Sequence, residues 1–211
     1  MRSRFPQTIP PNPRKRTLIF IDLANLESAL RRAHQAIDWH LFRDVLAEGK
    51  EVLEAVIYAG LPPATAVFAK QRQTMEYFLR KLEFEGYLVE RKIGKPIDAL
   101  NFKANVDVMM AIDAMELAAI IRPDVAILVT GDGDFAPLAL KLRRLGISVE
   151  VAGIGGENLA DELKSAANAV IDLAEVIRRA KLKITPTPKA TPSDKPAMST
   201  SAKVVEGKQA S

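Results

Sequence analysis

The sequence predicts an α/β domain with a mostly parallel central sheet that helices cover on both faces. Three observations lead to this fold class. Short apolar runs rich in β-branched residues alternate with helical segments along most of the 211 residues, which is typical of β-α units. The run VAILVT is apolar throughout, as the buried strands of parallel sheets are. No segment repeats, and the length suits one such domain with a full core.

The expected elements follow in order along the chain. Gly86 and Gly146 are placed to end helices as C-terminal caps, and Arg122-Pro123 ends the helix before it. Residues 91–96 (RKIGKP) are expected to form a basic loop. The helix at 102–121 is too apolar to be a surface helix, so we expect it to be buried. The strands are expected at 17–21, 52–58, 87–93, 125–130, 147–151 and 169–171, and the helices at 26–35, 39–48, 65–85, 102–121, 135–145, from about 158, and up to about 182.

Charge and proline separate the two ends of the chain from its body. Residues 1–16 carry five basic residues and no acid, and residues 183–211 carry five lysines and two acids. The body, residues 17–182, therefore has a net charge of −4, although the whole chain is +4. Eight of the 13 prolines also lie in the ends. We expect an extended basic arm at 1–16, one domain at 17–182 and a disordered tail at 183–211. The basic ends either contact a polyanion such as nucleic acid or act only as solubilising segments.

The composition excludes several classes of function. The chain has no cysteine, which excludes disulfides, thiolate nucleophiles and cysteine metal sites and suits the reducing cytoplasm. His34 and His40 are its only histidines, too few for a histidine-rich metal site. No apolar run approaches the roughly 18 residues of a membrane span, and no signal peptide pattern opens the sequence. A cytoplasmic protein that does not contact membranes is predicted.

Acidic residues gather where the chemistry of open α/β sheets is usually found, at the carboxyl ends of the strands. Asp22 and Asn25 follow the first expected strand, and Asp132 and Asp134 follow the run VAILVT. On the expected buried helix, Lys103 and Asp107 share a face with Ala111 and Ala114, within about 80° at 100° per residue. A buried carboxylate requires a cation, hydrogen bonds or a metal ion.

These aspartates are candidate ligands of a metal ion. If Asp22, Asp107, Asp132 and Asp134 converge, their charges repel unless a cation neutralises them. Hard oxygen ligands without histidine or cysteine favour Mg²⁺ or Mn²⁺ over zinc. Such ions activate water and stabilise the leaving oxygen in phosphodiester hydrolysis. Each acid also has a structural alternative, because aspartate commonly caps helices or favours their first turn. Asp113, about 120° around the helix from Asp107, is expected to play only a supporting or structural part.

Three motifs in this order resemble the NYN domain family of PIN-like ribonucleases, in particular its LabA-like branch. The motifs are FIDLANL, KANVDVMMAIDAM and ILVTGDGDFAPLALKLRRLGISVEVAG, and the resemblance spans about residues 17–172. It implies a PIN-like three-layer α/β/α sandwich with a metal-dependent site that cuts RNA, and it makes a homodimer an expected form. The family's acidic positions fall on Asp22, Asp107, Asp132 and Asp134, and its companion asparagine and lysine on Asn25 and Lys103.

The roles that this resemblance implies are specific. Asp22, Asp107 and Asp132 bind the first metal ion, and Asp134 is a ligand or orients the attacking water. Asn25 holds a metal-bound water or a substrate phosphate, and Lys103 neutralises the cluster or touches the scissile phosphate. Basic residues expected to bind the RNA, unless they belong to a solvated loop, are Arg91, Lys92 and Lys95.

Other functions stay open at this point. A catalytically silent RNA-binding or regulatory scaffold with the same fold is the main alternative. An aspartyl-phosphate phosphatase would need a second acid two residues after Asp22, where Ala24 stands. Nucleotide binding at the glycines of residues 153–156 lacks the full glycine motif that opens a helix.

Overall fold

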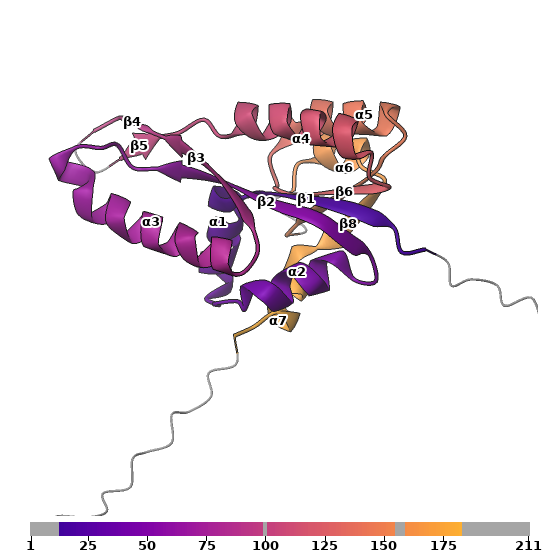
Figure 1. The fold of residues 1–211 in the computed structure, drawn as a ribbon, viewed down its shortest axis with the longest axis horizontal. Helices are drawn as coiled ribbons and strands as arrows, with labels where there is room; N and C mark the ends of the chain where they lie inside the picture. Colours follow the sequence, from indigo (N-terminus) through magenta and orange to yellow (C-terminus); the bar gives the residue numbers. More distant parts are fainter. Residues whose placement is uncertain (1–12, 99–100, 155–158, 183–211) are drawn as a thin grey trace, which may run out of the picture.

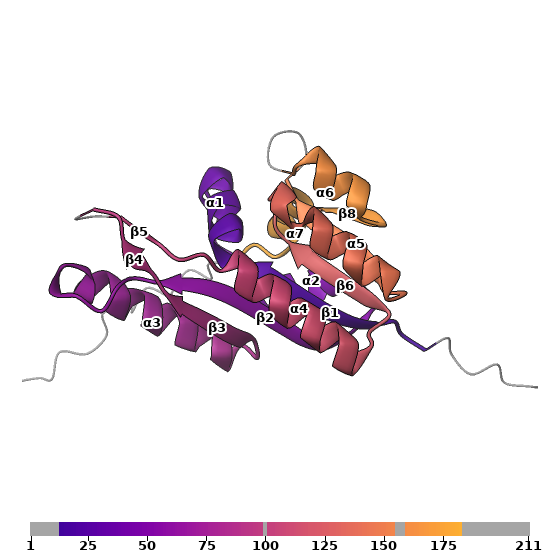
Figure 2. The same cartoon turned by 90° about the horizontal axis from the view of Figure 1, so that it is seen from above.

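A computed structural model describes residues 13–98, 101–154 and 159–182. Its centre is a six-stranded sheet with helices on both faces (Figures 1 and 2). The strand order is β3-β2-β1-β6-β7-β8, and every neighbouring pair in this sheet is parallel. The prediction of a three-layer α/β/α sandwich around a mostly parallel sheet is therefore confirmed.

The elements that form the sandwich have the following bounds. The strands of the large sheet are β1 (Arg16–Asp22), β2 (Glu51–Leu61), β3 (Leu88–Ile93), β6 (Val125–Val129), β7 (Ser148–Gly153) and β8 (Ala169–Asp172). A separate two-stranded ribbon contains β4 (Lys95–Pro96) and β5 (Phe102–Lys103). The helices are α1 (Leu23–Ala33), α2 (Trp39–Ala47), α3 (Ala69–Phe84), α4 (Asp107–Ile121), α5 (Ala136–Arg144), α6 (Asp161–Ala166) and α7 (Leu173–Arg179), with 3-10 turns at Ala66–Phe68 and Gly133–Phe135.

Each face of the sheet has its own apolar core. Helices α1, α2, α3 and α7 cover one face, and α4, α5 and α6 cover the other (Figure 1). Along β1, Ile19 and Ile21 belong to the first core, and Leu18 and Phe20 belong to the second. Because both faces are covered, successive side chains of the central strands are all buried, which accounts for their unbroken apolar sequence.

The strand order fixes where a site can form. From β1 the chain moves outward through β2 to β3, and it then crosses back through α4 to β6 on the other side of β1. The neighbouring strands β1 and β6 therefore lead into connections that leave in opposite directions, which is the position where ligands of open α/β sheets bind. Ile21 is paired with Val129, so the residues that follow these two emerge side by side at the carboxyl edge.

Two predicted boundaries near this edge are wrong. Helix α1 begins at Leu23 rather than near residue 26, so Asn25 lies in its first turn. Helix α4 begins at Asp107 rather than at Phe102. Phe102 and Lys103 instead form β5, paired with β4 in the segment expected to be a loop.

Aromatic packing explains why α4 begins later than the helical sequence pattern predicts. The Phe102 ring stands edge-on to Phe68 at a centroid distance of 6.0 Å. It also packs against Gly94, and a Cβ added to that glycine would overlap ring carbons of Phe102. Ala104 also lies close to Gly60, since a Cβ added at Gly60 would stand 2.9 Å from the Cβ of Ala104. These contacts with distant residues override the local helical preference.

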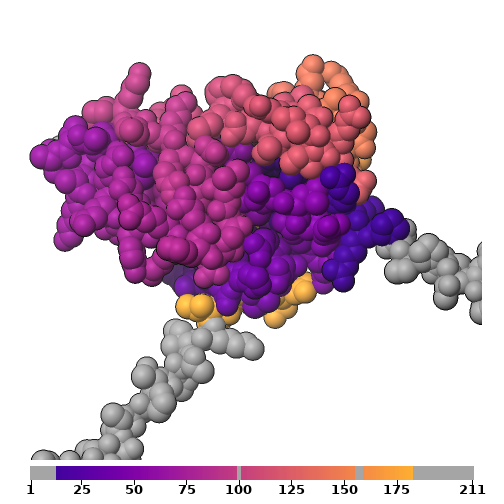
Figure 3. Space-filling view, viewed as in Figure 1, coloured from indigo at the N-terminus to yellow at the C-terminus, as the bar shows by residue number. Residues whose placement is uncertain are grey.

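Helix α4 is a surface helix, so the prediction that it is buried is wrong. Its inward face, which includes Ala114 and Ala118, packs on the sheet. Its outward side chains Val108, Ile112 and Ile120 are 60%, 60% and 70% exposed. Figure 3 shows the helix at the outer surface of the molecule. Within the described residues nothing covers this apolar face.

Several sequence predictions fall on parts of the chain that are not described. Residues 1–12 of the basic arm, the tail at 183–211 and residues 155–158 in the glycine turn lie outside the described residues. The division into arm, domain and tail therefore stays a prediction. In the described ranges, no helix is long and apolar enough to cross a membrane.

Candidate active site

Asp22 is the last residue of β1 and caps the helix that follows. Its carboxylate accepts a hydrogen bond from the backbone N–H of Asn25 at 3.2 Å. The residue is only 5% exposed, and burial raises the pKa of its carboxyl above the ordinary value. The Asn25 N–H partly offsets this rise, and the charge of Asp107 adds to it. The capping alternative for Asp22 is thus confirmed, and the same carboxylate also faces a second acid.

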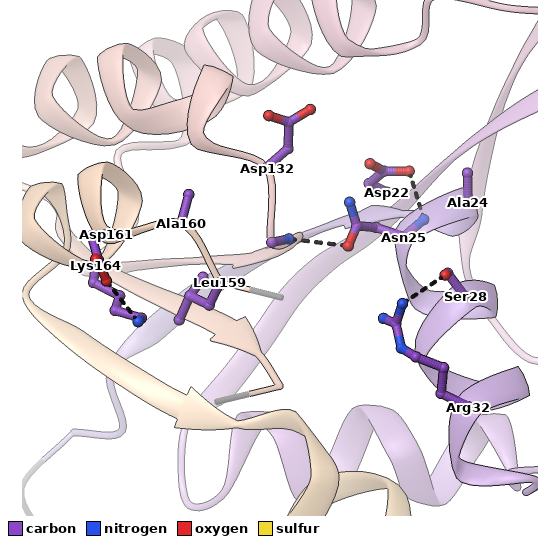
Figure 4. A pocket seen from close by; sticks show the side chains of 11 residues that line it. Asp22, Ala24, Asn25, Ser28, Arg32, Asp132, Leu159, Ala160, Asp161 and Lys164 are labelled. Carbon is purple, nitrogen blue, oxygen red and sulfur yellow. Dashed lines mark hydrogen bonds and ion pairs between the residues drawn. The ribbon is translucent and has the colours of Figure 1, made fainter. Parts of the chain in front are cut away.

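Asn25 joins the two turns that carry the acidic residues. Its side-chain Oδ1 accepts a hydrogen bond from the backbone N–H of Gly131 at 3.2 Å. Its side chain also hydrogen-bonds to Asp22, which favours the ionised carboxylate and lowers its pKa. Asn25 therefore fixes the turn after β6 relative to the end of β1, as the dashed lines in Figure 4 show.

Asp132 lies in the turn after β6 and caps the 3-10 turn Gly133–Phe135. Its Oδ1 accepts from the backbone N–H of Asp134 at 2.9 Å, and its own N–H donates to Thr130 Oγ1 at 3.2 Å. The capping residue of this turn is therefore Asp132. The first helical turn of α5 has no side-chain cap and contains Pro137 instead.

Asp107 lies at the start of α4, near the same edge of the sheet. It is the first residue of α4 and shares the inward side of that helix with Ala114. Burial raises the pKa of its carboxyl, and the charges of Asp132 and Asp134 raise it further. Lys103 lowers it, although this lysine approaches from β5 and not from the helix face expected for it. The four aspartates and Lys103 thus share one electrostatic environment.

This set of side chains fits a hard divalent cation. All four acids offer carboxylate oxygens. The charge of Asp107 raises the pKa of Asp22, and the charges of Asp132 and Asp134 raise the pKa of Asp107. A cation such as Mg²⁺ or Mn²⁺ relieves that repulsion and prefers these oxygen ligands. In the part of the chain that the structure describes, no three acidic or histidine side chains already stand in a metal-binding arrangement.

A cleft of about 650 Å³ opens beside the acidic residues. Asp22, Asn25 and Asp132 line its acidic side, and the opposite sides carry cations that the sequence analysis missed (Figure 4). Arg32 projects from α1 and Lys164 from α6. Arg32 follows Asn25 by seven residues, or two helical turns. The helical spacing therefore places both side chains on the same face of α1, and the sequence could have indicated Arg32. No local pattern links Lys164 to the site.

The predicted RNA-binding residues separate into two groups. Arg91 forms an ion pair with Glu83 at 2.7 Å and donates to the Val89 carbonyl at 3.0 Å, so it is engaged on the α3 side. Lys92 and Lys95 are exposed, and with Lys103 they line a second hollow of about 420 Å³. The structure therefore gathers Lys92, Lys95 and Lys103 and leaves Arg91 out.

Asp113 stands apart from the four acids. Burial raises the pKa of its carboxyl, and the charge of Glu116 adds to the rise. Tyr58 is fully buried under α4, and burial followed by the charge of Asp113 raises its own pKa. Asp113 thus lies near a buried tyrosine rather than among the four acids, and its supporting or structural part stays a prediction.

The comparison with known proteins decides the family. The model of the NYN domain matches residues 16–174. The chain belongs to the NYN domain family. Among solved structures, this NYN protein is similar to a protein of unknown function, VPA0982, from Vibrio parahaemolyticus RIMD 2210633. The two share 28% identity with a TM-score of 0.62 over 79% of this chain and 97% of that chain.

A weaker similarity connects the NYN protein with a mutant of T5 5′-exonuclease. The identity is 15% and the TM-score 0.39, over 65% of this chain and 50% of that chain. No curated protein matches the NYN protein. The family match confirms the resemblance inferred from the three sequence motifs.

Proposed function

We propose that this NYN protein is a metal-dependent ribonuclease that hydrolyses RNA phosphodiester bonds with Mg²⁺ or Mn²⁺. The observation that carries the proposal is the electrostatic coupling of Asp22, Asp107, Asp132 and Asp134 at the carboxyl edge between β1 and β6. An uncompensated group of carboxylates lowers stability unless a cation binds it. We also propose the cytoplasm as the compartment, because the chain contains no cysteine.

The residues take the following parts in this proposal. Asp22, Asp107 and Asp132 hold the cation, which when bound polarises the phosphate and activates water. Asp134, on the exposed turn, binds the cation or orients the water. Asn25 keeps Asp22 and the Gly131 turn in place, and it is proposed to hold a metal-bound water or a substrate phosphate.

Lysines on one side of the acids are the proposed entry for RNA. Lys92, Lys95 and Lys103 form no ion pair in the described part of the chain, so their charges are available to phosphates. Lys103 reaches the acidic cluster itself and is proposed to neutralise the scissile phosphate. Among the described residues, this surface offers no run of exposed aromatic side chains for base stacking, so little sequence preference is expected.

A cleavage assay on unstructured single-stranded RNA tests the proposal. We expect products with Mn²⁺ or Mg²⁺, none with EDTA, and none with Asp132→Asn. The asparagine keeps an oxygen that caps the 3-10 turn, so the variant should fold. If neither protein cuts while both bind RNA equally well, the chain is an RNA-binding scaffold and the ribonuclease proposal is wrong.

The exposed apolar face of α4 supports the proposal that the chain forms a homodimer. Val108, Ile112 and Ile120 lie on one side of the helix, and a twofold axis brings the same patch of a second copy against it. We expect Ile112→Glu to convert a dimer to a monomer in analytical ultracentrifugation, because it places a charge in the apolar contact. Phe84→Glu is the control, since Phe84 is exposed at the end of α3. A wild-type protein that is monomeric at all concentrations would contradict this proposal.

A further inference from the structure

We propose that Arg32 with Ser28, and Lys164 across the cleft from them, form a subsite for backbone phosphates of the nucleic acid, next to the acidic cluster. This inference rests on the proposed function and extends it, because it adds a second contact on the side of the acids away from Lys92 and Lys95. The cleft of about 650 Å³ holds these three side chains together with Asp22 and Asp132. Neither the family match nor the sequence motifs assign them a role.

Arg32 is a cation with unused donors. Its guanidinium donates to Ser28 Oγ at 3.2 Å, one turn back on α1. No carboxylate in the described residues lies within ion-pair distance of it, whereas the neighbouring Arg31 pairs with Glu27 at 3.6 Å. A guanidinium carries five N–H donors in a planar fork that suits phosphate oxygens. Together with the Ser28 hydroxyl, Arg32 can therefore surround an anion.

Lys164 approaches the same cleft from α6, on the side opposite α1 (Figure 4). Its Nζ pairs with Asp161 Oδ1 at 2.9 Å, and the Asp161 side chain is 91% exposed. Such exposed pairs contribute little, because water screens them and both side chains lose freedom. A backbone phosphate that approaches Lys164 therefore displaces Asp161 readily. Asp161 limits the positive charge of the cleft when no ligand is bound.

The charges around the acidic cluster indicate why a second group of cations is needed. The four aspartates repel a polyanion, so a substrate must be held by cations on both sides of them. Lys92, Lys95 and Lys103 supply one side, and Arg32 and Lys164 supply the other. An RNA backbone bound at both would cross the edge between β1 and β6 with one phosphate over the acids.

Binding of a fluorescent single-stranded RNA in EDTA tests the subsite without cleavage. We expect Arg32→Gln and Lys164→Gln to weaken binding about three- to tenfold each and to lower the slope of log affinity against log salt by about 0.7. Asp161→Asn is expected to tighten binding, because it frees Lys164. Arg31→Gln is the matched control on the same helix and should bind like wild type. The melting temperatures should all match, since these side chains lie at the surface.

The outcomes separate the subsite from the proposed function. If Arg32→Gln and Lys164→Gln bind RNA as wild type does, or if Arg31→Gln weakens binding as much as they do, the subsite is wrong even where the protein cuts RNA. If they weaken binding while wild type cuts no RNA with metal, the subsite stands and the ribonuclease proposal fails. A nucleoside monophosphate is the second ligand in the same assay. If the two variants lose the mononucleotide and keep RNA, the cleft binds free nucleotides and the backbone assignment is overturned.

Discussion

Replacing Asp22 with asparagine is expected to raise the melting temperature of the metal-free protein at neutral pH and to abolish most metal-dependent cleavage. Asparagine retains the oxygen that accepts the Asn25 N–H and caps helices as well as aspartate does. It removes a buried charge that faces Asp107. Cleavage should fall by at least about 100-fold, because residues that merely orient a metal ligand already cost about 10- to 100-fold when they are lost.

The pH dependence of this gain has a definite sign. Burial raises the pKa of Asp22 in the folded protein above its ordinary value of 3.8, so the folded state binds the proton more tightly than the unfolded chain. The stability that the Asp22 carboxyl contributes to the wild type therefore decreases as the pH rises from the pKa of Asp22 in the unfolded chain to its higher pKa in the folded protein. The advantage of Asp22→Asn should be largest at neutral pH and vanish below the unfolded pKa.

Thermal unfolding in EDTA, with and without added Mn²⁺, checks these expectations. Mn²⁺ should stabilise the wild type more than Asp22→Asn, because a ligand that binds only the folded state raises its stability. Asp38→Asn is the matched control, since Asp38 caps α2 through the Leu41 N–H at 2.9 Å. It should change neither cleavage nor the response to metal. A destabilised Asp22→Asn protein at neutral pH would show that its carboxylate is stabilised by the fold and that no cation is needed there.

The acidic part of the site could be predicted because it follows from strand ends. An apolar run that stops at Asp22, or two residues before Asp132, marks a buried strand and the polar edge beyond it. Neighbouring parallel strands then bring these residues together whatever the details of the helices. A capping role does not exclude a second role at this edge, because Asp22 caps α1, Asp132 caps a 3-10 turn, and both also line the cleft.

The rest of the site depends on contacts between distant segments. Lys103 was expected beside Asp107 on one helix, and it does lie near Asp107, but through β5. The pairing of β5 with β4 places the Phe102 ring against Gly94, a contact between distant residues that no local pattern encodes. Lys164 enters the cleft only because α6 packs beside α5 and the turn after β6. The positions of these two lysines follow only from the tertiary fold, whereas the periodicity of apolar residues predicts one helix or strand at a time.

Gly94→Ala is expected to damage both the fold and the proposed activity, because the close approach of Phe102 sets the position of Lys103. An added Cβ would overlap ring carbons of Phe102 and stand 3.2 Å from the Leu61 carbonyl oxygen. Overpacking of this kind costs about 1–3 kcal/mol of unfolding free energy, or several degrees of melting temperature at about 2–4 °C per kcal/mol. Cleavage should fall about 10- to 100-fold, since a displacement near 1 Å in a catalytic group has that effect.

Two further variants separate strain at the β4–β5 ribbon from general loss of stability. Gly146→Ala adds a Cβ with nothing within 4 Å, at a residue with φ of +85°, so it should cost stability through the backbone and leave the cleavage rate unchanged. Phe102→Leu shortens the side chain that the Cβ added by Gly94→Ala would meet. Combined with Gly94→Ala, it should restore part of the melting temperature and part of the rate, which makes the two substitutions non-additive. If the double variant shows no such rescue, or if Gly146→Ala lowers the rate as much as Gly94→Ala, then the contact between Gly94 and Phe102 does not position Lys103.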